Sequence, residues 1–375
     1  MKKALLFAPM ASVHRRFNKA NVLALRELGY EIHLLANFNV GEGPESKNDI
    51  YLKDCERENI IVHSLPFFRH SLRKNLKFTK DIKQLIAREQ FDIIHAHTET
   101  GGLLLRLCCS AAKKNCKLVY TPHGMSFYKG SSIKSQIIYK PIEKWISNKM
   151  NFNLSMNSEE KYWFDKWKPN SSFFVHGVGL DLTRFNGIQP NKNYLFKAFD
   201  ISADSKTVVS VGELDSNKNH IIVIEAISKM ENKNNVFYII CGVGPLKEKL
   251  ENYANEKGVN LILAGFRNDV PQIVSSCDVF VFPSHHEGLP VSLMEAMAVG
   301  TPSVVSQIRG NIDLIENGLN GFTVLKDSAD EYKTKIDMVF SDSEKALYFS
   351  QKSAEKIKQF DLRNVKNELK YLYAR

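Results

Sequence analysis

Apolar residues occur along the whole chain in short runs, and the stretches between the runs have helical periodicity. The runs are rich in β-branched and aromatic residues, which predicts buried strands at 2–9, 30–37, 91–98 and 116–124, and at 206–214, 235–244, 260–266, 279–284 and 301–308. Residues 18–29 and 245–258 are predicted helices that end on Gly29 and Gly258, as helices commonly do. A long amphipathic helix is expected over about 345–375.

Strands and helices alternate in both halves of the chain. This alternation predicts an α/β protein with two doubly wound, parallel-sheet (Rossmann-like) domains, and 375 residues are too many for one ordinary core. The linker is placed in the polar stretch 182–193, which contains Gly187 and Pro190. Because ligands of such sheets bind beyond the carboxyl ends of the strands, chemistry is expected in the loops that follow the strands.

The first residues could be mistaken for a short secretory signal. Pro9 interrupts that apolar stretch, Arg15 and Arg16 follow it, and a buried first strand is the better interpretation. No apolar run approaches the roughly 18 residues of a membrane span. The six cysteines form no C-x-x-C pair, which is typical of the reduced thiols of a cytosolic protein.

The excess positive charge lies in the first half of the chain. Residues 1–187 contain 29 Lys and Arg against 17 Asp and Glu, a net charge of +12, whereas the remaining residues carry −2. An anionic partner of the first half would explain this asymmetry; the alternative is a set of solvated lysine-rich helices. The basic stretch 67–88, with Leu72, Leu76 and Ile82 on one helical face, is a candidate interfacial segment for an anionic membrane.

The stretch 279–325 contains the strongest chemical signal. A predicted strand ends at Pro283, and the loop SHHEGL leads to Pro290, the expected first residue of a helix that runs to Gly300. The backbone N–H groups of Leu289, Val291 and Ser292 would face outward at the positive end of this helix. Such a helix start is suited to a phosphate or a sugar hydroxyl.

Several ordered motifs resemble family-4 glycosyltransferases of the two-domain GT-B fold, in particular members that build capsules and exopolysaccharides. The main one is HEGLPVSLMEAMAVGTPSVVS, with Glu287 and Glu295 eight positions apart. VGELDSNKNH, GVGPLKEKL and LAGFRNDV precede it in the family's order, and IHAHT, YTPHGMSFYKG, PIEKW and HGVGLDLTRF lie in the first half. The resemblance covers nearly the whole chain and implies two domains that face each other across a cleft. It places the acceptor-binding domain at 1–185, with a C-terminal helix at about 357–375 packing back on it, and the nucleotide-sugar domain at 190–356.

The resemblance also implies roles for individual residues. Glu287 would contact the hydroxyls of the transferred sugar, Glu295 the ribose, Lys218 the diphosphate, and His123 the reacting sugar. The expected donor-binding set is completed by Gly212, Gly288, Leu289, Pro290, Val291, Arg267 and Arg309. Ser12, His97 and Lys129 are expected on the acceptor side.

Two positions depart from the family pattern. Glu213 stands where members commonly have an arginine that assists the lysine, so Arg267 or Arg309 would have to help Lys218. Pro9-Met10-Ala11-Ser12 replaces the common paired-glycine loop.

The residues themselves favour a transferase without a metal. Two carboxylates eight residues apart along a helix are separated by up to about 12 Å, beyond the roughly 5–9.5 Å of a glycosidase pair. There is no Asp-x-Asp motif of the kind that holds Mg²⁺ or Mn²⁺. A metal pair at His95 and His97 lacks a third ligand, and polar contacts are the preferred interpretation. No cofactor is expected, and fixed donors such as Lys218 would stabilise the leaving diphosphate.

The resemblance therefore implies a retaining glycosyltransferase. It would move a sugar from a nucleotide diphosphate sugar, a UDP-sugar by preference, onto an undecaprenyl-diphosphate-linked or growing surface glycan. Its expected location is the cytoplasm, peripheral to the inner leaflet of the plasma membrane. The alternatives are a UDP-N-acetylglucosamine epimerase-type enzyme of the same fold and a catalytically silent partner that binds nucleotide sugar or anionic lipid. An oxidoreductase is disfavoured because no G-x-G-x-x-G follows the first strand, and nucleic-acid binding because no known motif accompanies the basic charge.

Overall fold

The computed structural model describes residues 1–39, 47–68 and 72–375. The chain forms two compact units. The first contains Met1–Gly179 together with Leu362–Arg375, and the second contains Leu180–Asp361. The unit boundary at Gly179 and Leu180 precedes the polar stretch 182–193 in which the linker was expected.

The first unit is built on a seven-stranded parallel sheet with the order β3-β2-β1-β4-β5-β6-β7. Its strands are β1 Lys2–Met10, β2 Tyr30–Asn37, β3 Ile61–Ser64, β4 Ile93–His97, β5 Lys117–Thr121, β6 Phe152–Ser155 and β7 Ser172–Phe174. The order reverses between β1 and β4. The loops that follow these two strands therefore diverge to opposite faces and leave a ligand position between them.

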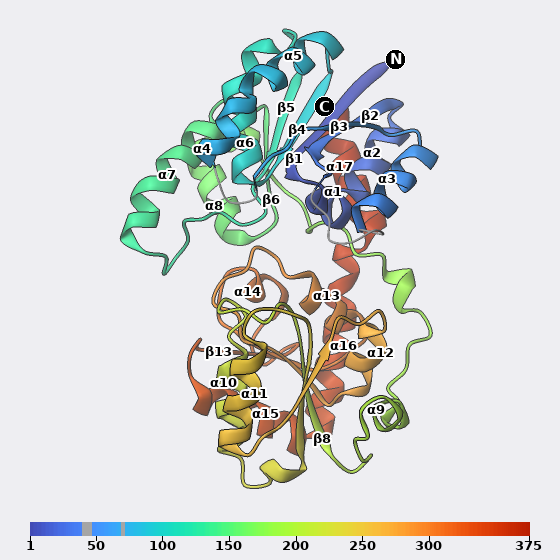
Figure 1. Ribbon diagram of the computed structural model, residues 1–375, viewed down its shortest axis with the longest axis vertical. Coiled ribbons are helices and arrows are strands. Elements are labelled where there is room, and N and C mark those ends of the chain that lie inside the picture. The colour runs from blue at the N-terminus through green and yellow to red at the C-terminus, as the bar shows by residue number, and fades with distance from the viewer. Residues whose placement is uncertain (40–46, 69–71) are drawn as a thin grey trace. The chain divides into compact units, whose positions relative to one another are not determined.

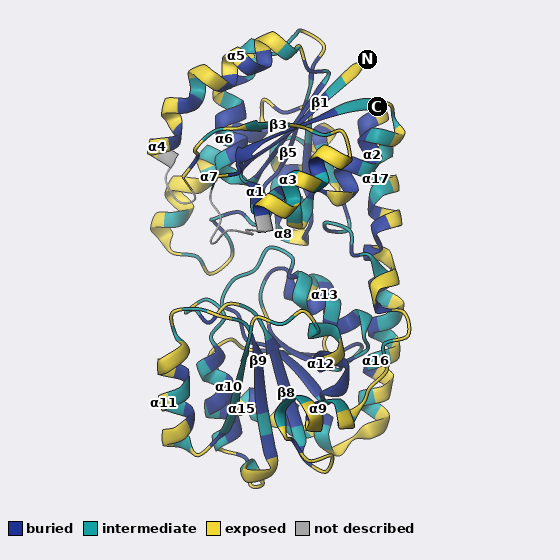
Figure 2. Cartoon of the chain, turned by 45° about the vertical axis from the view of Figure 1, so that its right-hand side comes forward, coloured by how far each residue is buried: buried dark blue, intermediate teal, exposed yellow. Residues whose placement is uncertain are grey.

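Helices cover both faces of this sheet (Figure 1). They are α1 Ala11–Phe17, α2 Lys19–Glu27, α3 Lys47–Arg57, α4 Leu72–Asn75, α5 Thr79–Glu89, α6 Thr98–Cys108, α7 Ile133–Ser147, α8 Ser158–Trp167 and α17 Leu362–Ala374. Side chains of β1 alternate between two cores: Leu5 and Phe7 pack with α5 to α8, and Ala4 and Leu6 pack with α2, α3 and α17. The sheets are buried and the exposed residues lie on the outer helices (Figure 2).

The second unit repeats the plan with six parallel strands in the order β10-β9-β8-β11-β12-β13. They are β8 Lys206–Val211, β9 Val236–Cys241, β10 Asn260–Gly265, β11 Val279–Phe282, β12 Ser303–Ser306 and β13 Phe322–Val324. Its helices are α9 Lys192–Phe199, α10 His220–Ser228, α11 Lys247–Lys257, α12 Val270–Ser276, α13 Val291–Ala298, α14 Asn311–Leu314, α15 Ala329–Ser341 and α16 Ser343–Ile357. The strand order reverses between β8 and β11, which again marks a ligand position.

Every strand that the sequence predicts is present, so the predicted α/β class is correct. The strands that were not predicted, β3, β6, β7 and β13, have three or four residues each. The predicted helix 345–375 is wrong in one respect: it is two helices, α16 and α17, separated at Lys358–Asp361. Asp361 is extended there (φ −57°, ψ 138°), and the carbonyl of Phe360 accepts from the N–H of Leu180.

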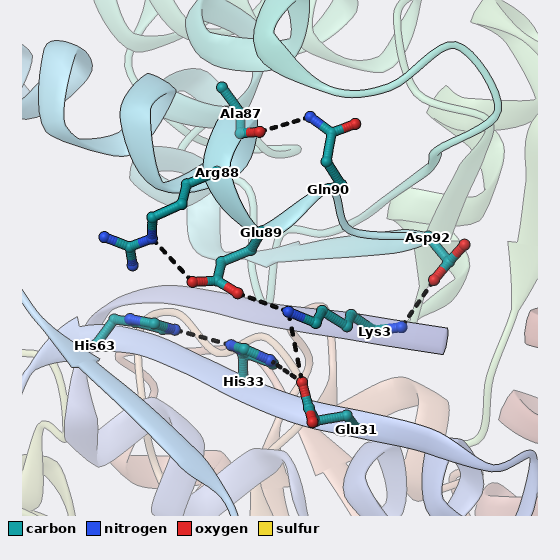
Figure 3. A network of polar contacts seen from close by, with 9 residues as sticks. All are labelled: Lys3, Glu31, His33, His63, Ala87, Arg88, Glu89, Gln90 and Asp92. Atoms are coloured by element: carbon teal, nitrogen blue, oxygen red, sulfur yellow. Dashed lines mark hydrogen bonds and ion pairs between the residues drawn. The ribbon is translucent and has the colours of Figure 1, made fainter. Parts of the chain in front are cut away.

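Charged groups near the starts of β1, β2 and β4 form a network of polar contacts that also includes His33 and His63 (Figure 3). The Lys3 ammonium donates to Glu89 (2.7 Å), and the Lys3 backbone N–H donates to Asp92 (2.7 Å). The hydrogen bond from Lys3 lowers the pKa of Glu89 to about 2. These contacts join the start of β1 to the residues that precede β4, so the network is a structural one.

Candidate functional site

In the second unit, the loops after β8 and β11 are joined at the point where the strand order reverses. The backbone N–H of His285 donates to the carbonyl of Asn217 (2.8 Å), and the Asn217 amide donates to the carbonyl of His286 (3.1 Å). These two bonds hold residues 212–219 against residues 283–290. The side chains that the two loops carry are therefore brought together.

Lys218 and Glu287 meet across this junction. The Lys218 ammonium lies 2.5 Å from Oε1 of Glu287, and both side chains are largely buried, with exposed fractions of 19% and 14%. The ammonium also lies 4.9 Å from the centre of the Phe282 ring. A partly buried ion pair of this kind provides a cation for phosphate and a carboxylate for sugar hydroxyls in one place.

Gly212 makes room for Lys218. A Cβ at this position would lie 3.2–3.3 Å from three carbons of the lysine stem. The loop also passes close to residues 242–244, because a Cβ on Gly242 would lie 1.7 Å from the Gly212 carbonyl oxygen. His220, the first residue of α10, fixes the other end of the loop through the carbonyl of Glu213 (3.2 Å) and the hydroxyl of Tyr238 (3.1 Å).

Arg309 is buried beneath the Glu287 loop. Its Nε donates to the carbonyl of Glu287 (3.2 Å), and its Nη2 donates to Nε2 of His286 (2.5 Å). The neighbouring Gly310 has φ +81°, and a Cβ there would lie 2.5 Å from the carbonyl oxygen of Gly288. Arg309 thus holds the backbone of the loop, and the structure groups it with Lys218 and Glu287.

The predicted helix after this loop is α13, which begins one residue later than expected and ends at Ala298. Pro290 precedes it as the N-cap residue, and the first intrahelical N–H, that of Met294, donates to the carbonyl of Pro290 (3.2 Å). The N–H groups of the first turn, including those of Val291 and Ser292, have no acceptor within the helix. The chain therefore presents backbone donors directly after Gly288 and Leu289.

Glu295 lies in the second turn of α13 with 22% of its side chain exposed. Burial raises its pKa above the ordinary value, and the Arg184 guanidinium, 4.0 Å away and mostly exposed, opposes this shift. A carboxylate that is partly desolvated and only weakly paired is able to accept hydrogen bonds from a ligand.

Arg267 and Glu213 lie outside this group. Arg267 forms a two-bond contact with Asp269, the residue before α12, and its guanidinium lies 5.5 Å from the ring of Phe199. Glu213 is exposed, and its backbone carbonyl forms a hydrogen bond with the ring of His220. Of the two arginines expected to help Lys218, Arg309 contacts the loop that carries Glu287, and Arg267 is paired with Asp269.

In the first unit, a cavity of about 330 Å³ lies at the carboxyl ends of β1, β4 and β5. The residues that line it are Pro9, Met10, Ser12, Val13, Arg16, Phe17, Thr98, Glu99, Thr100, Pro122, His123 and Gly124. Two of them, Thr98 and His123, have positive φ values of 67° and 57° although neither is a glycine. Such backbone strain tends to occur at functional sites.

His123 faces this cavity and is held from behind by His97. Its Nε2 lies 2.9 Å from Nδ1 of His97, and its ring stacks on Phe17 with centroids 5.1 Å apart. Burial lowers the pKa of His123 to about 3, so the ring is neutral. His97 is fully buried and lies outside the cavity lining, so it supports His123 and does not face the cavity itself.

His95 belongs to a separate chain of hydrogen bonds. Its two ring nitrogens contact the hydroxyls of Tyr373 (2.7 Å) and Thr121 (2.9 Å), and the Tyr373 hydroxyl donates to Asn21 (2.6 Å). These polar contacts were the preferred interpretation of His95 and His97. Among the described residues, no group of three or more His, Cys, Asp or Glu is placed as metal ligands would be. Metal independence is a property of the reaction and stays a prediction.

Ser12 and Lys129 differ in their position. Ser12 is in the cavity lining and is the last of the four residues that replace the family's paired-glycine loop. Lys129 is exposed and absent from that lining, and its backbone N–H donates to Glu159 (2.7 Å). The acceptor role predicted for Lys129 therefore has no geometric support.

Sequence reasoning missed Arg16 and Glu99 in the cavity and Asn217 in the donor-side junction. Glu99 follows the strand that ends in His97, so the rule that selected His123 could also have found it. Asn217 acts through its backbone and amide, and a single sequence gives no signal for such a contact.

Comparisons with known proteins match both halves of the chain. Residues 19–168 match the family described as "Glycosyltransferase Family 4", and residues 191–356 match "Glycosyl transferases group 1". An Escherichia coli relative, UDP-Gal:alpha-D-GlcNAc-diphosphoundecaprenol alpha-1,3-galactosyltransferase, is 30% identical over 74% of this chain and 75% of its own. The chain belongs to the family-4 glycosyltransferases. The Bacillus subtilis protein EpsD is 26% identical over 100% of this glycosyltransferase and 97% of EpsD.

Solved structures support the same fold. Anabaena HepE in complex with UDP superposes with a TM-score of 0.79 at 17% identity, covering 100% of both chains. Sucrose-phosphate synthase from Thermosynechococcus elongatus gives a TM-score of 0.80 at 17% identity, covering 100% of this chain and 98% of that one. The predicted GT-B fold is confirmed. Within the described residues, no helix combines the length and the apolar character needed to cross a bilayer.

Proposed function

We propose that this glycosyltransferase transfers a sugar from a UDP-sugar, with retention of configuration, to a lipid-linked diphosphate saccharide during the synthesis of a bacterial surface polysaccharide. The observation that carries the proposal is the Lys218–Glu287 pair at the strand-order reversal of the second unit, directly before α13. A cation, a carboxylate and a helix start at one such position match the successive parts of a nucleotide diphosphate sugar.

On the donor side, Lys218 neutralises the diphosphate and the N–H groups at the start of α13 hydrogen-bond its oxygens. Glu287 accepts from hydroxyls of the transferred sugar, and Glu295 accepts from the ribose. Arg309 keeps the Glu287 loop in place through the Glu287 carbonyl and His286. All charge on the leaving group is met by fixed protein donors, so the reaction proceeds without a metal ion.

The chemical step breaks the bond between C1 of the sugar and the oxygen of the β-phosphate. The acceptor hydroxyl forms its bond to C1 on the same face, and its proton passes to the departing phosphate oxygen. Lys218 stabilises the charge that develops on this oxygen. No protein nucleophile takes part, and Glu287, paired with Lys218, serves to bind the sugar.

The choice of UDP and of a lipid-linked acceptor is supported by the relatives. The name of the E. coli relative specifies UDP-Gal and a diphosphoundecaprenol acceptor, and HepE was crystallised with UDP-glucose. A Campylobacter jejuni relative, 28% identical over 56% of this chain, is also named for a diphospho-undecaprenol acceptor. The relatives named here are transferases, so the epimerase alternative is not favoured.

On the acceptor side, the cavity of the first unit offers groups of both kinds that a phosphorylated saccharide needs. Arg16 and the Ser12 hydroxyl suit phosphate oxygens, and Glu99 and the neutral imidazole of His123 suit sugar hydroxyls. Because the imidazole of His123 is neutral, it does not attract a phosphate through charge. Its role is to hydrogen-bond the reacting sugars.

The proposed membrane contact is an anionic inner leaflet. Part of the predicted interfacial segment 67–88 lies outside the described residues, namely 69–71 and the side chain of Leu72. Ile82 was expected on the membrane-facing side of this segment. That expectation is wrong, because Ile82 is fully buried in the core of the first unit. Leu76 and neighbouring basic residues of α4 and α5 remain exposed.

Helix α7 offers a more apolar surface for the membrane than the segment 67–88 does. It projects from the side of the unit (Figure 1), and Ile133, Ile137 and Ile138 are exposed by 77%, 68% and 44%. Exposed Lys134 and Lys144 lie on the same helix. Exposed isoleucines beside lysines suit the interface of an anionic bilayer.

A donor screen tests the function. The protein is incubated with UDP-, GDP- and dTDP-sugars in EDTA, with and without a diphosphoundecaprenol-linked saccharide. The expected result is UDP release that requires both a UDP-sugar and the acceptor. Conversion of the donor sugar without an acceptor would support the epimerase, and a strict Mn²⁺ requirement would contradict the metal-free step.

Liposome flotation tests the membrane contact. Binding to vesicles that contain phosphatidylglycerol and not to pure phosphatidylcholine is expected, and the double variant Ile133→Asn/Ile137→Asn should bind more weakly. The matched control is Leu347→Asn, an exposed leucine of the second unit (60%). Equal flotation with both lipids, or an equal loss in the control, rules out this surface.

A further inference from the structure

The first unit contains a carboxyl group buried behind the His123 loop that the proposed reaction does not use. Glu143 lies in the second half of α7, and only 1% of it is exposed. The hydroxyl of Tyr120, at the end of β5, lies 3.0 and 2.9 Å from its two oxygens. Burial, and next the charge of Glu99, raise the pKa of Glu143 well above its ordinary value. These surroundings favour the protonated form of the carboxyl group.

Two further carboxylates hold the loop that carries His123. Glu99, on α6, accepts from the backbone N–H of Ser126 (2.6 Å) and from the Ser126 hydroxyl. Glu160, on α8, is fully buried and accepts from the backbone N–H of Gly124 (2.8 Å). The N–H groups one and three residues after His123 are thus fixed by carboxylates of two helices.

Glu143 adds a third anchor next to this loop. Its two oxygens accept from the Tyr120 hydroxyl at the end of β5, two residues before the loop begins at Pro122. The charges of Glu99 and Glu160 act on the same carboxyl group.

We propose that Glu143 is a positioning residue of the glycosyltransferase that holds the end of β5 through the Tyr120 hydroxyl and thereby fixes the loop 122–126 with His123 facing the cavity. The backbone of His123 at φ +57° is strained and persists only if its surroundings hold it. The inference rests on the proposed acceptor-side role of His123, and the tests below use no substrate, so they can fail independently of the proposed function.

Glutamine and leucine at position 143 separate the loss of the acid from the loss of the hydrogen bond. Glu143→Gln keeps an acceptor for Tyr120 and cannot ionise. Glu143→Leu has a similar volume and cannot accept that hydrogen bond. Glu56→Gln, on the exposed surface of α3, is the matched control for the loss of an acid.

The imidazole nitrogens of His123 and His97 report the loop geometry in ¹⁵N NMR spectra of histidine-labelled full-length protein, assigned with His123→Gln. Their signals should be unchanged in Glu143→Gln and Glu56→Gln at pH 7, and shifted or broadened in Glu143→Leu. A purely space-filling role for Glu143 predicts unchanged signals in Glu143→Leu, and that result would overturn the proposal.

Thermal unfolding against pH provides a second measurement. A carboxyl whose pKa is raised on folding reduces stability as the pH rises from its unfolded value, roughly 4.3, towards the folded value. The Tm of Glu143→Gln relative to wild type should therefore increase with pH above about pH 5, and that of Glu56→Gln should not. A Tm difference that is constant with pH, or that decreases, would contradict the neutral acid.

Discussion

Lys218 and Glu287 neutralise each other, and Gly212 gives the lysine stem its space. The proposed donor diphosphate would bring a second anion to the same ammonium, and the partly buried surroundings would strengthen that contact. The energetic contribution of Lys218 is therefore expected to depend on the phosphates of the ligand and not on its nucleoside.

Lys218→Ala should weaken the binding of UDP by about 1.5–3 kcal/mol, the usual range for hydrogen bonds to charged groups, and leave uridine binding unchanged. Isothermal titration calorimetry of both ligands measures this difference. Lys229→Ala, an exposed lysine paired with Asp330, is the control and should affect neither ligand. An equal loss for uridine and UDP would show that Lys218 does not meet the diphosphate.

Glu295 should make UDP binding dependent on pH. Burial raises its pKa, so the carboxylate that we propose for the ribose becomes protonated at a higher pH than an ordinary glutamate. UDP affinity should fall as the pH is lowered from 8 towards 5, by more than protonation of the UDP phosphate, with a second pKa of about 6, accounts for. In Glu295→Gln affinity should be weaker at pH 8 and should keep only the pH dependence of that phosphate; a variant that keeps the full wild-type pH profile contradicts this role.

At the scale of elements, the donor-side loops depend on a close backbone crossing. A Cβ on Gly242 would lie 1.7 Å from the carbonyl oxygen of Gly212, and this oxygen cannot rotate away as a side chain could. Residues 212–214 and 242–244 are also joined by backbone hydrogen bonds, such as that from Leu214 to Val243 (3.1 Å). The crossing sets the path of the loop that carries Lys218.

Gly242→Ala should therefore destabilise the second unit by more than about 3 kcal/mol, the upper end of ordinary overpacking. Gly187→Ala is the control, since a Cβ there meets nothing within 4 Å, and only the strain of positive φ, about 1–2 kcal/mol, is expected. Urea unfolding measures both. Similar costs for the two variants would mean that the crossing can relax.

Helix α17 is tied into the first unit through Tyr373, whose buried hydroxyl bonds His95 and Asn21. Tyr373→Phe leaves both groups without that partner and should reduce stability by about 1–3 kcal/mol. Tyr371→Phe, 65% exposed, is the control and should have little effect on urea unfolding. A negligible effect of Tyr373→Phe would show that this hydroxyl does not help to hold the C-terminal helix.

The longer elements could be predicted from sequence because their periodicity and end signals agree. The helix 245–258 ends at Gly258 in the left-handed region (φ +64°), as its sequence indicates. Short strands such as β7 were missed because three residues carry no periodicity, and their position depends on neighbours in the sheet. The break between α16 and α17 was missed because Leu180, far away in sequence, contacts it.

The candidate site was predictable where a motif fixes local geometry. Glu287, Pro290 and Glu295 follow one another along a single loop and helix, and their arrangement matches the prediction. Arg267 was placed by order along the chain, but its side chain is held by Asp269, a neighbour two residues away. The buried acid Glu143 lies on the same helical face as buried Ile146, a pattern that indicates burial but not a partner.

At the scale of the whole molecule, the two units share one plan, a parallel sheet whose order reverses beside its first strand. Each has its candidate ligand groups at the carboxyl ends of the strands at that reversal, with Lys218 and Glu287 in one unit and His123 in the other. The excess positive charge lies in the half of the chain with the proposed acceptor and membrane contacts. This division of charge fits a donor side and an acceptor side with different partners.

A crystal structure of the protein with UDP tests the central claim most directly. It should place the diphosphate against the Lys218 ammonium and the first N–H groups of α13, with the ribose hydroxyls at Glu295. A nucleotide bound elsewhere, with Glu295 still facing Arg184 and Lys218 still paired only with Glu287, would contradict the account.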